Sequence, residues 1–180
     1  SVTRQFFLWF WFIPTQAGNL ISQIREKSDR RIDLLINTHH HGDHTGGNIA
    51  FKGIVDKVVA HTNSKLNQEA VAKNRKTEDQ QLYPDTTFDT SWSQPVGDEI
   101  VRAYYFGAAH TNGDSVIHFE NANVAHIGDI LFNRRFPYID KTAGASIENW
   151  IQVLQDIKKT FDNDTRFIFG HAAEKYPVTG

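Results

Sequence analysis

The sequence of 180 residues predicts one layered domain of the α/β (α+β) class, spanning residues 1–180. Two observations carry this prediction. Strand-like apolar runs alternate with segments of helical periodicity, and no linker, repeat or low-complexity stretch interrupts that order. The residues best suited to bind a metal come immediately after predicted strands. In layered folds, binding sites commonly lie at the ends of strands. A chain of this size can bury one substantial core.

The N-terminal part is predicted to contribute a strand, a helix and a second strand. Residues 6–13 (FFLWFWFI) are apolar and β-branched or aromatic up to Pro14, which favours a buried strand over the tail of a signal sequence. The run is much shorter than the roughly 20 residues that cross a bilayer. Residues 16–28 have the periodicity of an amphipathic helix. Residues 32–37 (IDLLIN) suit a strand buried on both faces, which leads into residues 38–48 (THHHGDHTGGN).

The middle of the chain is predicted to hold a strand, a helix, a loop and three more strands. Residues 57–61 form the first of these strands, and a helix over 63–74 follows with Asn63 or Ser64 as its cap. Residues 73–89 are polar and without periodicity, which predicts a surface loop. The later strand-like runs are residues 99–106, 115–120 and 123–127.

The C-terminal part is predicted to hold one helix and one strand. Ser146 is suited to cap a helix that runs to Lys159. The side chains predicted on its buried side are Ile147, Ile151, Leu154 and Ile157. Residues 166–169 are then predicted as a last strand, which ends at Gly170 and His171.

The composition excludes several kinds of site and partner. The chain has no cysteine, so disulfides, thiolate ligands and a cysteine nucleophile are excluded, and any metal must be held by nitrogen and oxygen. A net charge of −2 provides no basic surface for nucleic acid or anionic lipid. We therefore expect a small-molecule substrate, no nucleic acid and no membrane partner; a homo-oligomer is compatible with the sequence.

The first residue is serine, and methionine is absent throughout. We therefore expect the chain to begin after a processing event or at a cloning boundary. A bacterial periplasmic or secreted location is slightly favoured over a cytoplasmic one.

A run of four histidines and one aspartate (HHHGDH) is the strongest functional signal in the sequence. His39 and His41 are two residues apart, so on extended backbone both imidazoles point the same way, toward one metal ion, while His40 points away. The glycine that follows can turn the chain sharply, so Asp43 and His44 can face a second metal. Residue type, spacing and the preceding buried strand favour a metal site over a solvated loop.

Each metal needs ligands from elsewhere in the chain, because a catalytic zinc ion generally takes about three protein ligands and keeps one position open. The candidates are His110 in GAAHTNGD, Asp129 in IGDILF and His171 in FGH, each near a glycine at a predicted strand end. The two oxygens of a carboxylate allow Asp129 to bridge two ions. An aspartate after glycine is also an ordinary turn residue, so Asp129 is the least specific of these candidates.

The remaining histidines are assigned no ligand role; they are His40, His61, His118 and His126. His118 alternates with apolar residues in a predicted strand, which indicates a surface or hydrogen-bonded position. Thr111, Asn112 and Asp114 either orient the imidazoles or form an ordinary turn, and the sequence does not choose between these roles.

In these ligand candidates the sequence resembles the metallo-β-lactamase superfamily, whose signature is His-x-His-x-Asp-His followed by a histidine, a bridging aspartate and a last histidine. The resemblance extends from about Ile13 to His171 and implies an αββα sandwich with its site at one edge. Only nine residues follow His171, where family members carry a closing helix. We therefore expect a sandwich that is trimmed at its ends, reduced, or completed by a neighbouring subunit.

The resemblance also implies a ligand set and a chemistry. The first metal is assigned to His39, His41 and His110, the second to Asp43, His44 and His171, and the bridge to Asp129. With two Zn²⁺ per chain, a hydroxide shared by the ions would attack the carbonyl of a β-lactam or a similar cyclic amide or ester. Asp43 would be catalytic by orienting the nucleophile or passing on its proton.

Residues after the bridging aspartate are candidates for substrate binding. Arg134, Arg135 or Lys141 lies where β-lactamases keep a basic residue for the substrate carboxylate, although loop charges are usually only solvated. Phe136 and Tyr138 are predicted either to wall the pocket or to join the core.

Two alternative functions stay open. Aspartate at the bridging position, in place of the cysteine of the commonest β-lactamases, looks more like the lactonase and thioester hydrolase branches. The alternative from another class is a non-hydrolytic metal-binding or di-iron redox domain. Redox relatives usually have glutamate where His41 stands, and histidine favours zinc over iron. Nucleic-acid processing is disfavoured because basic surface is lacking.

Overall fold

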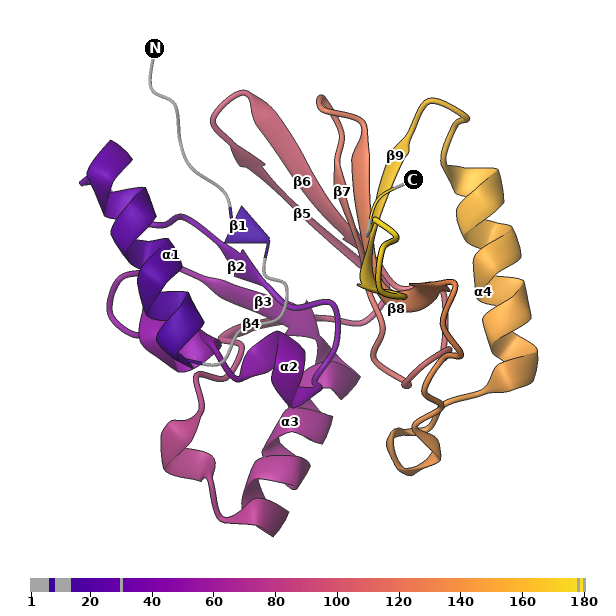
Figure 1. The fold of residues 1–180 in the computed structure, drawn as a ribbon, viewed down its shortest axis with the longest axis horizontal. Coiled ribbons are helices and arrows are strands. Elements are labelled where there is room, and N and C mark those ends of the chain that lie inside the picture. Colours follow the sequence, from indigo (N-terminus) through magenta and orange to yellow (C-terminus); the bar gives the residue numbers. More distant parts are fainter. Residues whose placement is uncertain (1–6, 9–13, 30, 178, 180) are drawn as a thin grey trace.

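The protein, seen here as a computed structural model, is described for residues 7–8, 14–29, 31–177 and 179. Figure 1 shows two β-sheets between helices. The first sheet is parallel, in the order β1 (Phe7–Leu8), β2 (Leu35–Ile36), β3 (Val58–His61) and β4 (Thr86–Phe88). The second follows the order β5 (Ser91–Val96), β6 (Glu99–Tyr104), β7 (Val116–Phe119), β8 (Val124–Asn133) and β9 (Arg166–Ala172). Its neighbours are antiparallel except β9, which runs parallel to β8.

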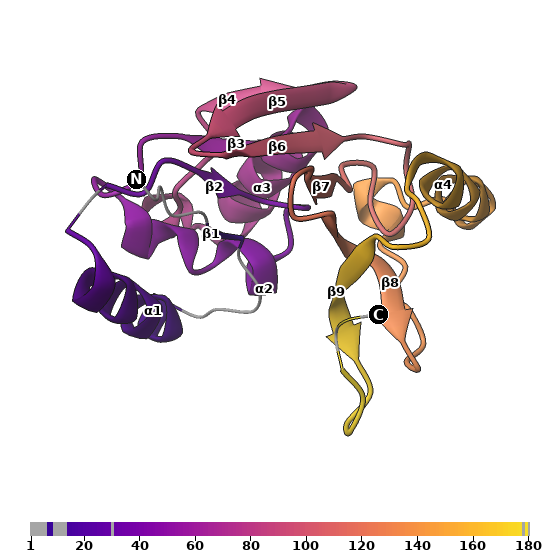
Figure 2. The same ribbon diagram turned by 90° about the horizontal axis from the view of Figure 1, so that it is seen from above.

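Helices cover the outer sides of the two sheets, as Figures 1 and 2 show. The long helices are α1 (Pro14–Lys27) and α3 (Thr62–Arg75) on the side of the first sheet, and α4 (Ile147–Thr160) beyond the second. The short elements are α2 (Gly42–Thr45) and the 3₁₀ turns η1 (Asn48–Phe51), η2 (Glu78–Gln80) and η3 (Lys141–Ala143).

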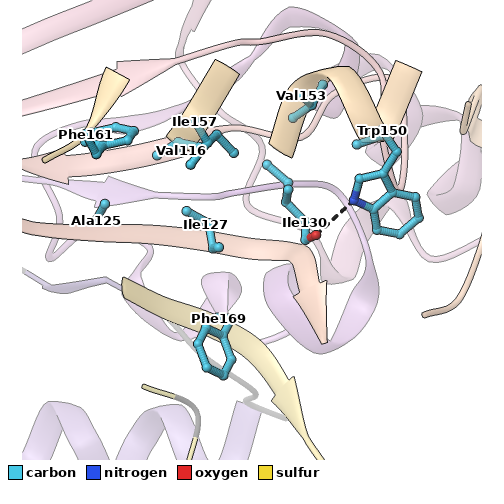
Figure 3. Close-up of a cluster of buried hydrophobic side chains, with 10 residues drawn as sticks. Val116, Ala125, Ile127, Ile130, Trp150, Val153, Ile157, Phe161 and Phe169 are labelled. Atoms are coloured by element: carbon cyan, nitrogen blue, oxygen red, sulfur yellow. Dashed lines mark hydrogen bonds between the residues drawn. The ribbon is translucent and has the colours of Figure 1, made fainter. Parts of the chain in front are cut away.

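Three buried apolar clusters hold these layers together. The first joins α1 to the first sheet, through Ala17, Ile24, Ile32, Leu35, Phe51 and Val58. The second lies between the sheets and consists of Leu34, Ile36, Val59, Phe88, Val96, Val101, Ala103 and Ile117. The third packs Trp150, Val153 and Ile157 of α4 against strands β7, β8 and β9, as drawn in Figure 3. Helix, sheet, sheet and helix therefore form the αββα sandwich that the resemblance implied.

The N-terminal elements follow the prediction as far as they are described. Of the strand predicted at residues 6–13, only Phe7–Leu8 is described, paired in parallel with β2, and residues 6 and 9–13 lie outside the described residues. The predicted helix 16–28 corresponds to α1, and the strand predicted at 32–37 is reduced to β2. Within the described ranges, no helix is both long and apolar enough to cross a membrane.

The prediction of a surface loop over residues 73–89 is wrong at both ends. Helix α3 continues to Arg75, and Thr86–Phe88 forms β4, paired with β3. Strand β5 was also missed. Its side chains alternate mostly between exposed and half-buried, and it contains Pro95, which an edge strand tolerates because that backbone nitrogen needs no partner. Both strands carry too little apolar signal to stand out from loops.

The cap predicted for α3 is also wrong. His61, the last residue of β3, is the N-cap, and its Nδ1 accepts a hydrogen bond from the backbone N–H of Asn63 at 3.2 Å. A histidine ring can serve where Ser or Asp is usual, because a neutral imidazole has one free acceptor nitrogen.

The start of α4 is as predicted, but its buried face is not. Ser146 caps the helix by accepting the N–H of Asn149 at 3.2 Å. The buried residues are Trp150, Val153 and Ile157, whereas the predicted ones are exposed except for Ile157: Ile147 by 53%, Ile151 by 58% and Leu154 by 38%. Apolar residues occupy two adjacent stripes of this helix, so periodicity alone could not show which stripe faces the sheet.

Candidate metal centre

The seven candidate ligands lie in loops after strands, in one short helix, and within strands β8 and β9. His39 and His41 follow β2, and Asp43 and His44 belong to the short helix α2 directly after them. His110 lies between β6 and β7, Asp129 in β8 and His171 in β9. Their ligand atoms form two groups, within each of which the atoms lie within 4.8 Å of one another.

The first group consists of His39, His41, His110 and Asp129. Nδ1 of His41 lies 3.1 Å from Nε2 of His39 and 2.9 Å from Nε2 of His110. Oδ2 of Asp129 lies 3.5 Å from Nε2 of His110 and 3.9 Å from Nε2 of His39. All four side chains are at least four-fifths buried, so the group is closed off from solvent on most sides.

Hydrogen bonds outside the group fix which nitrogen of each ring faces inward. Nδ1–H of His110 donates to the carbonyl of Tyr138 at 2.7 Å, and Nε2–H of His41 donates to Oδ2 of Asp140 at 2.8 Å. Nδ1 of His39 is 3.2 Å from the hydroxyl of Thr38. Because the outer nitrogens are engaged in this way, the inner ones can present lone pairs to a shared ion.

The second group consists of Asp43, His44 and His171. Oδ2 of Asp43 lies 3.4 Å from Nε2 of His44 and 3.3 Å from Nε2 of His171. This group is more open than the first, because the side chain of Asp43 is 39% exposed. Asp129 links the two groups: its Oδ1 is 3.2 Å from Nε2 of His44, and its Oδ2 is 3.1 Å from Nε2 of His171.

Two glycines allow Asp129 to reach this position. Gly128 has a φ of +50° and comes so close to Thr38 that a Cβ would lie 2.7 Å from its side chain. The register of β8 against β9 shifts on both sides of Gly128, which is the signature of a β-bulge. A Cβ on Gly170 would collide with Oδ1 of Asp129 and lie 3.2 Å from Cε1 of His44. The β-bulge at Gly128 and the lack of a side chain at Gly170 together leave space for the Asp129 carboxylate between the two groups.

The donor set fits divalent metal. Ligand atoms about 2.0–2.1 Å from a tetrahedral zinc ion lie about 3.3 Å from one another, close to the spacing in both groups. Nε2 and Nδ1 of His44 and Oδ1 of Asp129 are buried without a hydrogen bond to any residue that the structure describes. Nε2 of His44 and Oδ1 of Asp129 contact each other only as an ion pair at 3.2 Å, and a bound cation would give each of these buried atoms a ligand bond instead.

Burial and the carboxylates divide the histidines into two protonation classes. Burial lowers the pKa of His39 well below its usual value and lowers that of His110 to about 4, even though Asp129 acts in the opposite direction on His110. Contacts with Asp129 and Asp43 raise the pKa of His171 to about 9. Burial opposes the same contacts at His44, but they prevail and raise its pKa to about 9. His39 and His110 of the first group are therefore neutral, whereas His44 and His171 of the second are ion-paired with carboxylates.

A cavity of about 740 Å³ opens onto both groups. Of the three predicted basic residues only Arg135 lines it; the guanidinium of Arg134 instead lies 4.5 Å from the ring of Tyr176. Phe136 and Tyr138 are 99% and 61% exposed and line the cavity, so of the two predicted alternatives the pocket wall is the one that the structure shows. The cavity lining also includes Arg75, which sequence reasoning missed.

The other polar residues of the sequence analysis support the site or lie apart from it. His40 is buried in the cavity wall and forms a third group with His41 and Asp140. Asp114 accepts hydrogen bonds from the backbone and hydroxyl of Thr111, both at 2.7 Å, which is turn chemistry rather than contact with an imidazole. Asn112 contributes to the same loop, because its carbonyl accepts from Asn63 at 2.9 Å.

Sequence reasoning also missed Asp140 and assigned no role to His126. Asp140 lies 99 positions from His41 and has no motif of its own. His126 is fully buried, and its Nδ1 accepts the N–H of Gly128 at 2.9 Å, which braces the bulge before Asp129. Neither role leaves a signal in local sequence.

Known proteins resemble this chain in sequence. The family model described as metallo-beta-lactamase superfamily matches residues 9–171. A metallo-beta-lactamase type 2 of Elizabethkingia meningoseptica is 28% identical over 153 residues, which cover 85% of this chain and 58% of that protein. Another, of Bacillus cereus, is 22% identical over 152 residues, or 84% of this chain and 56% of that protein. The chain thus spans a little over half the length of these relatives.

Solved structures show the same fold. The metallo-beta-lactamase IND-7 superposes with a TM-score of 0.73 at 22% identity, covering 97% of this chain and 78% of that one. A metallo-beta-lactamase from Pontibacter korlensis superposes with a TM-score of 0.72 at 17% identity, covering 93% of this chain and 75% of that one.

Proposed function

The chain belongs to the metallo-β-lactamase superfamily, and from this premise we propose that it is a binuclear zinc hydrolase that cleaves a β-lactam or a similar cyclic amide or ester. The observation that carries the proposal is the joining of two ligand groups by one carboxylate, that of Asp129, at the floor of a solvent-accessible cavity. Two metals held about 3.5–4 Å apart are typical of hydrolases that activate water.

The donor chemistry supports zinc. The first group offers three imidazole nitrogens and one carboxylate, the second two nitrogens and carboxylate oxygens, and neither contains sulfur. Such nitrogen-rich sets suit zinc better than iron, whose hydrolytic and redox sites are richer in oxygen. Bound there, zinc would lower the pKa of water toward neutrality and polarise a carbonyl oxygen.

The chain's own residues would orient the substrate and move its protons. Contacts with His171 and His44 outweigh the effect of burial and hold the pKa of Asp43 far below its usual value, so this exposed carboxylate is ionised at neutral pH. It can orient a water molecule or carry its proton. Arg135, on the cavity wall, is the candidate to bind an anionic group of the substrate.

A lactone or thioester is the second candidate substrate. The observation that favours it is the aspartate at the bridging position, which resembles the lactonase and thioester hydrolase branches. Fold and ligand geometry alone do not choose among these carbonyl compounds.

The test is metal analysis combined with a substrate panel on zinc-loaded protein, comprising a cephalosporin, a lactone, a thioester and an aryl phosphate. We expect about two zinc ions per chain and hydrolysis of a carbonyl substrate. Asp43→Ala should lower kcat by at least about a hundredfold. Asp164→Ala, which removes an exposed carboxylate remote from the site, should not. Less than one metal per chain, or full activity of Asp43→Ala, would overturn the proposal.

A further inference from the structure

An apolar groove lies beside the metal cavity and has no role in the function proposed above. It is formed by the end of β8, the loop that follows and the outward face of α4, and its volume is about 310 Å³. Its walls include Ile130, Phe132, Pro137, Ile151 and Leu154, and among the described residues that line it only Arg135 is charged. This size is at the lower end of cavities that bind small molecules.

The exposed stripe of α4 forms one wall of this groove. Ile147, Ile151 and Leu154 follow one another at helical spacing and leave 53%, 58% and 38% of their surface exposed. Single exposed apolar residues are common, but a contiguous apolar wall in a groove usually marks a binding surface. The adjacent stripe of the same helix is buried, and from it Trp150 also lines the groove; its Nε1–H donates to the carbonyl of Ile130 at 2.9 Å (Figure 3).

The groove adjoins the metal cavity, because Phe132 and Arg135 line both. The ring of Phe132 stacks on that of His171, with centroids 5.2 Å apart and an interplanar angle of 2°, and lies 5.7 Å from the ring of His110. One aromatic ring therefore separates the ligand histidines from the groove. Arg135 makes no hydrogen bond or ion pair with any residue that the structure describes, so its charge is available at the junction.

We propose that the groove binds the apolar chain of an acyl substrate while the carbonyl carbon of that substrate lies at the metal centre. The inference rests on the proposed hydrolase function and narrows its substrate class to amphiphilic esters or thioesters. The guanidinium of Arg135 orients such a ligand. The polar end of the ligand faces Arg135 and the metal cavity, and only its acyl chain enters the apolar groove. A protein partner would need about 800 Å² of surface on each side, which a groove of this size does not supply alone.

The test measures kcat/KM of zinc-loaded protein for p-nitrophenyl esters and acyl thioesters with chains of two to ten carbons. Each methylene that enters the groove should raise kcat/KM by about twofold to fourfold. Ile151→Glu places a charge in the groove at an exposed position, so the fold should tolerate it, and it should lower the decanoyl-to-acetyl ratio of kcat/KM at least tenfold. The matched control is Leu66→Glu, at a leucine of α3 that is 55% exposed and lines neither cavity; its ratio should equal that of the wild type.

A second measurement does not depend on hydrolysis. Binding of octan-1-ol, followed by tryptophan fluorescence, should be saturable in wild type and Leu66→Glu and at least tenfold weaker in Ile151→Glu. If octanol binds as expected but only a cephalosporin or a lactone is cleaved, the hydrolase proposal stands and the acyl-substrate inference fails. If octanol binds and no carbonyl compound of either series is cleaved, the hydrolase proposal fails and the substrate assignment of the groove fails with it. Only the groove inference fails if acetyl esters are cleaved but chain length has no effect on kcat/KM. The same holds if kcat/KM of Ile151→Glu rises with chain length as steeply as that of the wild type. A wild-type dimer that Ile151→Glu converts to monomers would identify the groove as an interface and overturn the inference.

Discussion

The two ligand groups on either side of Asp129 differ in burial and in charge. His39 and His110 of the first group are almost wholly buried, and burial keeps their imidazoles neutral. In the second group Asp43 is 39% exposed, and the pKa of both His44 and His171 is raised to about 9 by carboxylates. The first group is therefore ready to receive a cation, whereas the second must first release protons.

This difference follows from where each group lies in the fold. The first group combines the buried end of β2 with the loop before β7, and each of its outer ring nitrogens lies against a protein oxygen. The second combines the one-turn helix α2 with β9 and faces the cavity. The same residue types thus yield a preorganised group and a proton-linked group.

Removing the charge that both groups share should have the largest effect. We expect Asp129→Asn to lose metal from both groups and to lower kcat/KM by roughly a thousandfold, because the amide cannot balance two cations. Metal content by mass spectrometry and hydrolysis rates would measure this. Asp114→Asn is the matched control: that aspartate is equally buried and bonds Thr111, and burial raises its pKa to about 7, so its amide resembles the neutral acid. Retention of both metals by Asp129→Asn would show that the groups are independent.

The ligand candidates could be found from the sequence because their residue types seldom occur at this spacing outside metal sites. His39, His41 and His110 lie together as the motif indicated, although metal binding itself stays a prediction. Their supporting residues could not be found in this way. Asp140 contacts His41 across 99 positions of sequence, and such a contact exists only once the two loops have packed.

The fold was predictable to a similar degree and for similar reasons. Elements with strong apolar periodicity, such as α1 and β3, lie close to where they were predicted. The edge strands β4 and β5 were missed, because exposed edges need little apolar sequence. The buried face of α4 was misassigned, because only the tertiary position of Trp150 decides between two apolar stripes.

A change of pH should affect the metal affinities of the two groups differently. In the metal-free protein His44 and His171, with pKa values near 9, carry protons at pH 7, so metal affinity of the second group should rise with pH up to about 9. Burial lowers the pKa values of His39 and His110, so these two ligands release no proton in this range and the metal affinity of the first group should rise less steeply with pH. Each proton that the metal displaces changes the metal affinity about tenfold per pH unit. The second group should therefore bind zinc at least about a hundredfold more weakly at pH 6 than at pH 8.

The measurement is equilibrium dialysis in a zinc buffer followed by metal analysis. About two zinc ions per chain are expected at pH 8 and about one at pH 6. A parallel loss of both ions would contradict the contrast between the groups. Unfolding at pH 6, checked by circular dichroism, would be the trivial cause of such a loss.

A smaller effect, limited to the first group, is expected when the hydrogen bond between His41 and Asp140 is altered. In Asp140→Asn the amide can still cap η3 through its oxygen, but its NH₂ would face Nε2 of His41 and favour the tautomer with the proton on Nδ1, toward the metal. We expect affinity of the first group to fall about 10-fold to 100-fold, with the second group unchanged. Competition with a chelator would measure both. Asp162→Asn is the control, since Asp162 also accepts hydrogen bonds within a turn, from Asp164 and Thr165 rather than from a ligand residue.

The variant with the smallest expected effect on metal binding tests whether the first group depends on packing against the adjacent apolar core. The ring of Trp150 lies 5.9 Å from that of His110, and its Nε1–H satisfies the carbonyl of Ile130. Trp150→Phe leaves this buried carbonyl without its donor, so the free energy of unfolding should fall by about 1–3 kcal/mol. Denaturant titration of the zinc-loaded protein would measure it, with Trp92→Phe, in β5 and away from the ligands, as the control. Because the outer nitrogens of the first group bond elsewhere, its metal affinity should change less than in Asp140→Asn. A larger change would mean that packing on the indole, rather than the hydrogen bonds of the rings, preorganises the first group.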